Sequence, residues 1–86
     1  MLSNLRMDIR KLLGANARRY REASDLSQEA VAERMGVDRA YISAIERGAQ
    51  NVTLTSLWEI AQALRVRPAA LLDESVMAGP DTSAEP

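Results

Sequence analysis

The side chain of Arg39 is the one in this chain best suited to sequence-dependent hydrogen bonding. It opens a short stretch in which Ile42 and Ile45 recur at helical spacing and face inward. Arg39, Ala40 and Ser43 should therefore point outward. A guanidinium matches atoms O6 and N7 of guanine, an alanine can contact a thymine methyl group, and a hydroxyl can hydrogen-bond to a base edge. We predict these three residues as contacts to the bases of DNA.

Residues 28–47 have the pattern of two short helices joined by a tight turn, an arrangement that reads DNA. Ala32 is small enough for the helices to cross closely, and Gly36 can take the positive φ of the turn. Ser27 and Asp38 can cap the first turns of the two helices. The apolar residues that would pack the pair recur at helical spacing: Val31, Met35, Val37, Ile42 and Ile45.

Two more residues of the second helix could reach the DNA backbone. Tyr41 could hydrogen-bond to a phosphate or lie with its ring against the core, and we prefer the phosphate role. Arg47 points outward on the helical spacing and is predicted as a second phosphate contact.

Three further helices are expected, which makes the predicted fold all-α with five helices. The first begins near Ser3 or Asp8, and Gly14 within it can mark a close approach of another helix. Thr53 can cap the fourth helix, and Pro68 fits the first position of a short fifth helix. The apolar positions of the first and fourth helices are Leu5, Ile9, Leu12, Leu13, Ala17, Tyr20, Leu54, Leu57, Ala61 and Leu64.

Charge is distributed unevenly along the chain, whose net charge is −1. Residues 1–72 hold all eleven bases against eight acids, whereas residues 73–86 hold four acids and no base. We predict one DNA-binding domain over residues 1–77 and a disordered acidic tail over residues 78–86. Ten of the bases are arginine, which suits bidentate contacts to phosphate and guanine, although a coding bias of the genome would explain it equally well.

The composition also narrows the class of protein. The chain has no Cys and no His, so disulfides and imidazole chemistry are excluded, and we expect no metal and no cofactor. No nucleophile has a base beside it, so we do not expect an enzyme. No apolar run is long enough for export or for a membrane span, so a cytoplasmic, nucleoid-associated protein is expected.

The run SQEAVAERMGVDRAYISAIERG, with TLTSLWEIAQALRV behind it, resembles the phage repressor and Cro class of helix-turn-helix proteins, the Xre family. Within that family, DRAYISAIERG followed by NVTLTSL is most similar to controller proteins of restriction-modification systems. The resemblance covers residues 13–72. It implies a transcriptional regulator that binds a pseudo-palindromic operator as a dimer, recruits or blocks RNA polymerase, and regulates its own operon.

The resemblance also implies where the protein holds the DNA backbone. A glutamine at the start of the second helix grips a phosphate in the family, and Gln28 stands at that position. Gln50 departs from the pattern, because several controllers carry an arginine there. The phosphate contacts implied for the loop and the helix behind it are Gln50, Asn51, Thr53 and Ser56.

A structural ion pair is implied by the same resemblance. In related repressors, the residues that match Arg21 and Glu46 tie the first helix to the end of the recognition helix. The alternative is two unrelated surface charges. Glu29, Glu33 and Arg34 are expected on a solvated helix face with local ion pairs.

A module of this size needs a second copy to read enough base pairs, and the fifth helix is the expected dimer surface. Trp58 could instead cover the edge of the core, and the apolar residues near the C-terminus could form a satellite core. The predicted interface residues are Trp58, Leu71, Leu72, Val76 and Met77.

One other function remains open, namely an antitoxin-like or partner-binding helical module with the same fold. A pure interaction domain has no reason to hold Arg39 and Gln28 in contact geometry, so these two residues discriminate between the alternatives.

Overall fold

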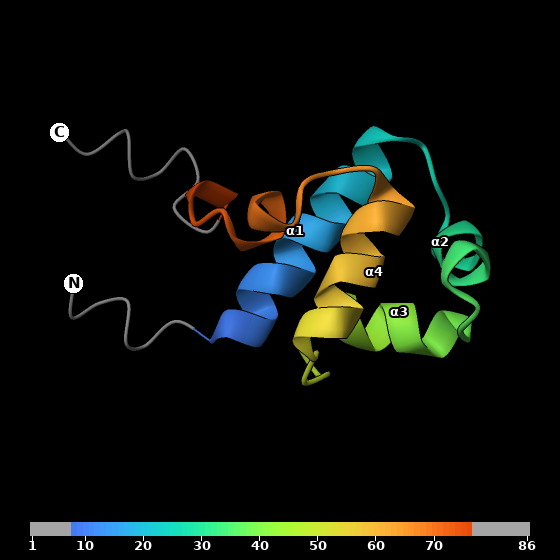
Figure 1. The fold of residues 1–86 in the computed structure, drawn as a ribbon, viewed down its shortest axis with the longest axis horizontal. Coiled ribbons are helices and arrows are strands. Elements are labelled where there is room, and N and C mark those ends of the chain that lie inside the picture. The colour runs from blue at the N-terminus through green and yellow to red at the C-terminus, as the bar shows by residue number, and fades with distance from the viewer. Residues whose placement is uncertain (1–7, 77–86) are drawn as a thin grey trace, which may run out of the picture.

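The computed structural model describes residues 8–76, which fold into four α-helices and one 3₁₀ helix (Figure 1). The all-α prediction is confirmed, but the predicted fifth helix is a 3₁₀ helix and the α-helices in this range number four. The predicted acidic tail, residues 78–86, lies outside the described residues, as do Ser3, Leu5 and Met77. The elements are α1 (Ile9–Ala23), α2 (Gln28–Met35), α3 (Arg39–Glu46), α4 (Leu54–Leu64) and η2 (Pro68–Leu72).

Side-chain caps determine where three of the helices begin. The Asp8 carboxylate accepts a hydrogen bond from the backbone N–H of Arg10 at 3.0 Å, so α1 begins after Asp8. Ser27 and Thr53 cap α2 and α4 in the same way, as predicted. Asp38 occupies the cap position of α3, but its side chain makes no capping hydrogen bond.

The turn between α2 and α3 depends on Gly36, whose φ is +72°. The backbone N–H of Val37 donates to the carbonyl of Ala32 at 3.0 Å, which closes the end of α2. The chain then enters α3 after a single extended residue, Asp38. The predicted tight turn is confirmed.

The crossing of α1 over α3 leaves no room for a side chain at Gly14. A Cβ atom there would collide with the carbonyl oxygen of Ile45 and would lie 2.7 Å from that of Glu46. The close approach expected at Gly14 is confirmed, and the helix it meets is the C-terminal end of α3.

The core lies where α1, α2, α3 and α4 converge, and η2 closes it through Leu71, which is fully buried. Two of the predicted apolar positions lie outside the core: Ile9 is 57% exposed and Leu54 is 83% exposed, and each is the first residue of its helix. Ile60 is buried on α4 instead. The buried apolar residues are Leu12, Leu13, Ala17, Val31, Ala32, Ile42, Ile45, Ile60, Ala61, Ala63, Leu64 and Leu71.

The 3₁₀ form of η2 is consistent with its length. The element has five residues between Arg67 and Asp73, which are both extended, so few α-helical hydrogen bonds could form. Instead, the N–H of Ala70 donates to the carbonyl of Arg67 at 2.9 Å. Among residues 8–76, no helix is both long and apolar enough to cross a membrane.

Candidate nucleic-acid interface

Helix α3 divides its residues between the core and the solvent as the sequence predicts. Ile42 and Ile45 are 3% and 2% exposed, so they fix which side of the helix faces inward. Arg39 and Ala40, at its start, are exposed, and Ser43 is partly exposed one turn later. The three residues predicted as base contacts therefore share one outward face, which is free to enter a groove of DNA.

The N-termini of α2 and α3 are joined by their side chains. The Nη1 atom of Arg39 donates to Oε1 of Gln28 at 3.0 Å. The Nε atom of Arg39 lies 3.8 Å from Oε2 of Glu29, a looser contact between two exposed side chains. Arg39 and Gln28, predicted to touch a base and a phosphate respectively, thus lie side by side on one ridge.

Behind this ridge, Arg21 and Glu46 form the predicted ion pair, with both oxygens of the carboxylate engaged. The Nε and Nη2 atoms of Arg21 donate to Oε2 at 2.6 Å and Oε1 at 3.1 Å. The Glu46 side chain is 6% exposed and that of Arg21 is 14% exposed. The hydrogen bonds to Glu46 raise the pKa of Arg21, so the guanidinium stays charged.

The pair connects to its surroundings at both ends. Arg21 also donates from Nη1 to the carbonyl of Leu26 at 2.8 Å, which holds the loop before α2. Glu46 accepts a further bond at Oε1 from Nε2 of Gln28 at 3.0 Å. This last contact was not predicted, because it depends on how α2 and α3 cross.

The remaining phosphate candidates lie beside the ridge and on the loop behind α3. Tyr41 is partly buried and its side chain packs against the core, while Arg47 is exposed. Asn51 and Thr53 are exposed, and the Thr53 hydroxyl donates to that of Ser56 at 3.1 Å. Gln50 is partly exposed.

Comparison with known proteins agrees with this geometry. The family model described as helix-turn-helix matches residues 18–71. The control protein C.SmaI of Serratia marcescens is 46% identical over 66 residues, which cover 77% of this chain and 79% of that protein.

The chain belongs to the helix-turn-helix family of transcriptional regulators.

Two solved structures of restriction-modification controller proteins are similar to this helix-turn-helix protein. That of C.AhdI from Aeromonas hydrophila has 39% identity and a TM-score of 0.69, and covers 72% of this chain and 94% of that one. The structure of the C.Esp1396I tetramer in complex with its natural 35 base-pair operator has 29% identity and a TM-score of 0.69. The match covers 80% of this chain and 90% of that chain. The family resemblance drawn from the sequence is confirmed, and the antitoxin-like alternative is not favoured.

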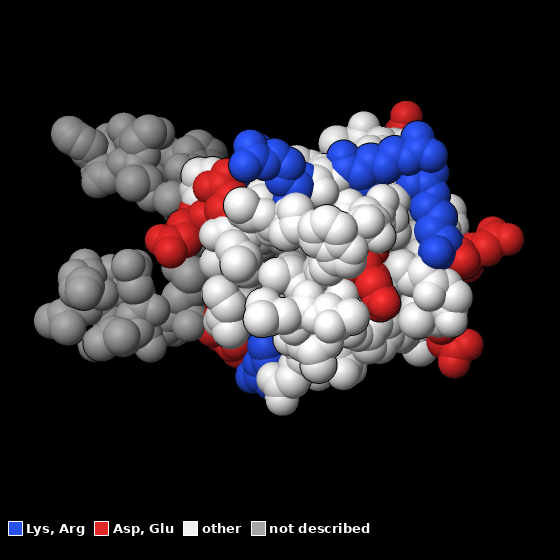
Figure 2. All heavy atoms as spheres, viewed as in Figure 1, with Lys and Arg blue, Asp and Glu red and all other residues white. Residues whose placement is uncertain are grey.

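A second surface of the helix-turn-helix protein is apolar and lies over α4 and the start of α1. Figure 2 shows that the face over α4 is largely uncharged, with basic side chains gathered towards its edges. Leu54 and Trp58 are 83% and 53% exposed on α4, and Ile9 is 57% exposed on α1. A groove of about 170 Å³ is lined by Leu54, Ile9 and Leu72, which is 39% exposed, and Trp58 lies outside this groove.

This surface corrects the predicted dimer interface at one position. Leu71 is fully buried inside the monomer, because η2 turns it towards the core, so it cannot contact a second copy. Trp58 and Leu72 are available, and Val76 is partly buried. Met77 lies outside the described residues.

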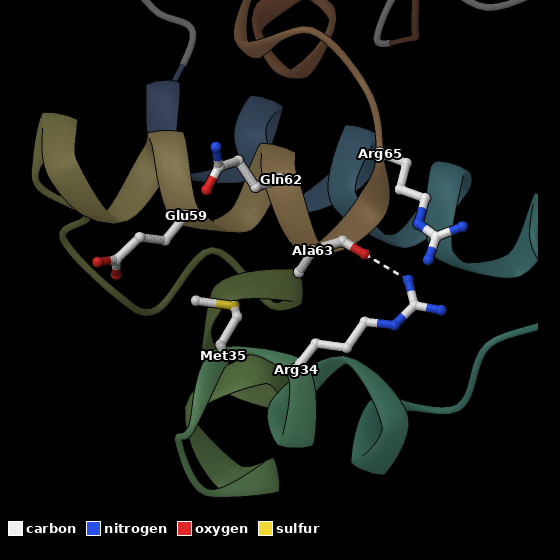
Figure 3. Close-up of a pocket in the computed structure, with 6 residues that line it drawn as sticks. All are labelled: Arg34, Met35, Glu59, Gln62, Ala63 and Arg65. Carbon is white, nitrogen blue, oxygen red and sulfur yellow. Dashed lines mark hydrogen bonds between the residues drawn. The ribbon is translucent and has the colours of Figure 1, made fainter.

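A larger concavity, of about 420 Å³, lies between α2 and the C-terminal half of α4 (Figure 3). Arg34 points into it and its Nη1 donates to the carbonyl of Ala63 at 2.6 Å. Arg34 is exposed, as expected, and this hydrogen bond also ties α2 to the end of α4. No group of metal-binding side chains occurs among residues 8–76.

Proposed function

We propose that the protein binds a pseudo-palindromic DNA operator as a homodimer and regulates transcription from an overlapping promoter. The observation that carries this proposal is the ridge on which Arg39 and Gln28 lie in contact at the N-termini of α3 and α2. A planar donor at the start of a recognition helix suits base edges, and an amide at a helix N-terminus suits a phosphate.

The outer residues of α3 divide between bases and backbone in this proposal. Arg39 reads a guanine, and Ala40 and Ser43 add smaller base contacts. The backbone is held at two places, by the start of α2 and by the loop that leads into α4. The proposed phosphate contacts are Gln28, Tyr41, Arg47, Gln50, Asn51, Thr53 and Ser56.

The homodimer forms through the apolar surface over α4, η2 and the start of α1. Exposed apolar residues gather there, and covering them with a second copy removes them from water. A two-fold dimer places two recognition helices about 34 Å apart, one turn of DNA. Leu54 and Ile9 join Trp58 and Leu72 in the proposed interface, and its extension to Val76 and Met77 is part of the proposal.

The regulated promoter is proposed from the likeness to controller proteins. The protein controls its own operon beside a restriction-modification system, acts in the cytoplasm on the nucleoid, and recruits or blocks RNA polymerase. Its concentration sets its effect, because dimerisation and operator binding are both equilibria that depend on protein concentration.

A binding assay tests the proposal. Duplexes selected from a random pool by the wild-type protein, together with the region upstream of its own gene, are titrated at several salt concentrations. We expect selection of a two-fold symmetric sequence, a steep fall in affinity with salt, and loss of affinity with Arg39→Ala. Arg18→Ala, which removes an exposed charge from α1, is the matched control and should bind as the wild type does. Tight binding that ignores both salt and Arg39 would reject the proposal.

A further inference from the structure

A continuous series of hydrogen bonds leads from the buried ion pair to the DNA-reading ridge. Glu46, whose side chain is 6% exposed, accepts from Arg21 and, through Oε1, from Nε2 of Gln28 at 3.0 Å. Gln28 in turn accepts through Oε1 from Nη1 of Arg39 at 3.0 Å. The side chain of Arg39 is 51% exposed, so the series begins in the protein interior and ends in solvent.

The chemistry of these groups allows the series to run in one direction only. An ionised carboxylate accepts hydrogen bonds and donates none, so Glu46 can engage only the NH₂ end of the Gln28 amide. The oxygen end of that amide must then face outward. A guanidinium donates and never accepts, so this oxygen is the end that Arg39 requires. If the amide were reversed, oxygen would face oxygen at Glu46 and NH₂ would face a cation at Arg39.

We infer that Glu46 is a positioning residue for DNA reading. It acts through Gln28 to set the direction in which the Arg39 guanidinium points. This inference rests on the proposed function, because it concerns the base that Arg39 reads. A guanidinium held in place before binding loses less side-chain freedom on the DNA and distinguishes guanine from other bases more sharply. The base selectivity of the surface arginine thus depends on a buried acid that touches no DNA.

The Glu46 carboxylate is itself fixed, which a positioning group requires. Arg21 holds both of its oxygens and is anchored at Nη1 by the carbonyl of Leu26 at 2.8 Å. The amide of Gln28 also keeps capacity for the phosphate role proposed above. An amide NH₂ has two N–H donors and Glu46 takes one, so the second can donate to the DNA backbone.

Glu29 offers a competing explanation for the direction of Arg39. Its Oε2 atom lies 3.8 Å from Nε of Arg39, but the Glu29 side chain is 72% exposed. Pairs of this kind contribute little in water, because solvent screens the charges and both side chains stay mobile. The route through Gln28 is shorter in every contact and starts from a carboxylate that is 6% exposed, so it is the one we assign.

The test measures base selectivity rather than affinity alone. An operator selected by the wild-type protein is altered one base pair at a time, and affinities are measured for the wild type and for Gln28→Ala, Glu46→Gln, Glu29→Gln, Glu33→Gln and Arg39→Ala. Arg39→Ala identifies the base pair that Arg39 reads. Circular dichroism sets a temperature at which every variant is folded. We call the series Glu46–Gln28–Arg39 the relay. Gln28→Ala keeps the Arg21–Glu46 pair, so it tests the relay even if Glu46→Gln is unstable.

We expect the wild type to discriminate at the Arg39 base pair by at least about fivefold. Gln28→Ala and Glu46→Gln should lower this ratio to about that of Arg39→Ala, with ratios at other base pairs unchanged. Glu33→Gln should leave every ratio as in the wild type. In the double variant Gln28→Ala/Arg39→Ala, the ratio at this base pair should fall no further than in Arg39→Ala.

Three results would overturn the relay while leaving the proposed function in place. One is a uniform loss of affinity at all base pairs, which indicates a structural or phosphate role only. Another is a loss of selectivity with Glu29→Gln and none with Gln28→Ala. The third is additive losses in the double variant. If the wild-type protein selects no sequence at all, the proposed function fails and the relay fails with it.

Discussion

Glu46 and Glu33 are both glutamates of the helix-turn-helix unit, but their surroundings differ. Glu33 is exposed on α2, whereas the Glu46 side chain is 6% exposed and accepts three hydrogen bonds from Arg21 and Gln28. Replacing both members of a buried ion pair with apolar groups is often neutral, whereas removing one member leaves an uncompensated charge. The two glutamates should therefore respond very differently to the same substitution.

Glu46→Ala should lower the free energy of unfolding by about 3 kcal/mol, because it leaves the Arg21 guanidinium largely buried without its partner. Glu33→Ala should change it by no more than about 0.5 kcal/mol. Urea unfolding of both variants at neutral pH measures the difference. Equal midpoints and slopes for the two variants would remove the ion pair from the account of stability.

Residue-scale contacts were the part of the structure that sequence patterns predicted least. The outward face of α3 could be predicted, because Ile42 and Ile45 fix it by local spacing. The bond between Glu46 and Gln28 could not, because it depends on the angle at which two helices cross. Asn16 was missed for the same reason: its Nδ2 donates to the carbonyl of Leu71 at 3.0 Å, a partner 55 residues away in sequence.

At the scale of elements, short-range signals set the helix ends and long-range packing set their contacts. Ser27 and Thr53 cap their helices as the sequence predicted, because a cap needs only its own next three residues. Leu54 lies in the same predicted apolar pattern as Ala61 and Leu64, yet only Ala61 and Leu64 are buried, because the core reaches only part of α4. Periodicity locates a helix face but not how far along it the neighbouring helices extend.

Gly14→Ala tests the crossing of α1 and α3. Alanine favours a helix by about 1 kcal/mol over glycine, so at an uncrowded site this change would stabilise the protein. Here the added Cβ meets backbone carbonyls of Ile45 and Glu46, which cannot move aside as a side chain can. We expect a net loss of about 2 kcal/mol or more in the free energy of unfolding, measured by thermal or urea denaturation. A rise in stability would show that the two helices separate easily.

The start of α1 should give stability a dependence on acid pH. Hydrogen bonds from the side chain and the backbone N–H of Arg10 lower the pKa of Asp8 from its usual 3.8. A carboxyl whose folded pKa is depressed stabilises the fold above its unfolded pKa, and this contribution is lost as the pH falls through the folded pKa. Asp8→Asn, which can still cap the helix, should therefore lower stability at neutral pH and match the wild type in strong acid.

Urea unfolding of Asp8→Asn across this pH range measures the effect. The matched control is Asp38→Asn, since Asp38 holds the same position on α3 without a capping bond. It should shift the pH dependence much less. A difference between Asp8→Asn and the wild type that stays constant down to strong acid would contradict the electrostatic cause.

At the scale of the whole molecule, the two proposed contact surfaces lie on different parts of the fold. The DNA-reading ridge is built from the N-termini of α2 and α3, and the apolar surface from α4, η2 and the start of α1. Helix α1 packs against both α3 and η2, so it connects the two surfaces (Figure 1). A dimer formed at one surface can therefore fix the spacing of the ridges at the other.

Leu54→Asp tests the proposed dimer. Leu54 is 83% exposed, so the change should leave the folded monomer intact while it places a charge in the apolar contact between copies. We expect the dimer dissociation constant to rise at least about tenfold in sedimentation experiments, with weaker operator binding as a result. Thr55→Asp adds the same charge at the next exposed position of α4, away from the groove wall, and serves as the control. Equal self-association of both variants would move the interface elsewhere.

The buried amide of Asn16 has a consequence for where the protein can be cut. Its Nδ2 donates to the carbonyls of Leu71 and Asp73, at 3.0 and 2.9 Å, and Leu71 itself fills the core. Removing η2 would open a cavity beside α1 and strand a polar group inside it. We therefore expect the smallest fragment that folds to extend through Asp73, so a helix-turn-helix unit transplanted into another protein would have to carry η2 with it.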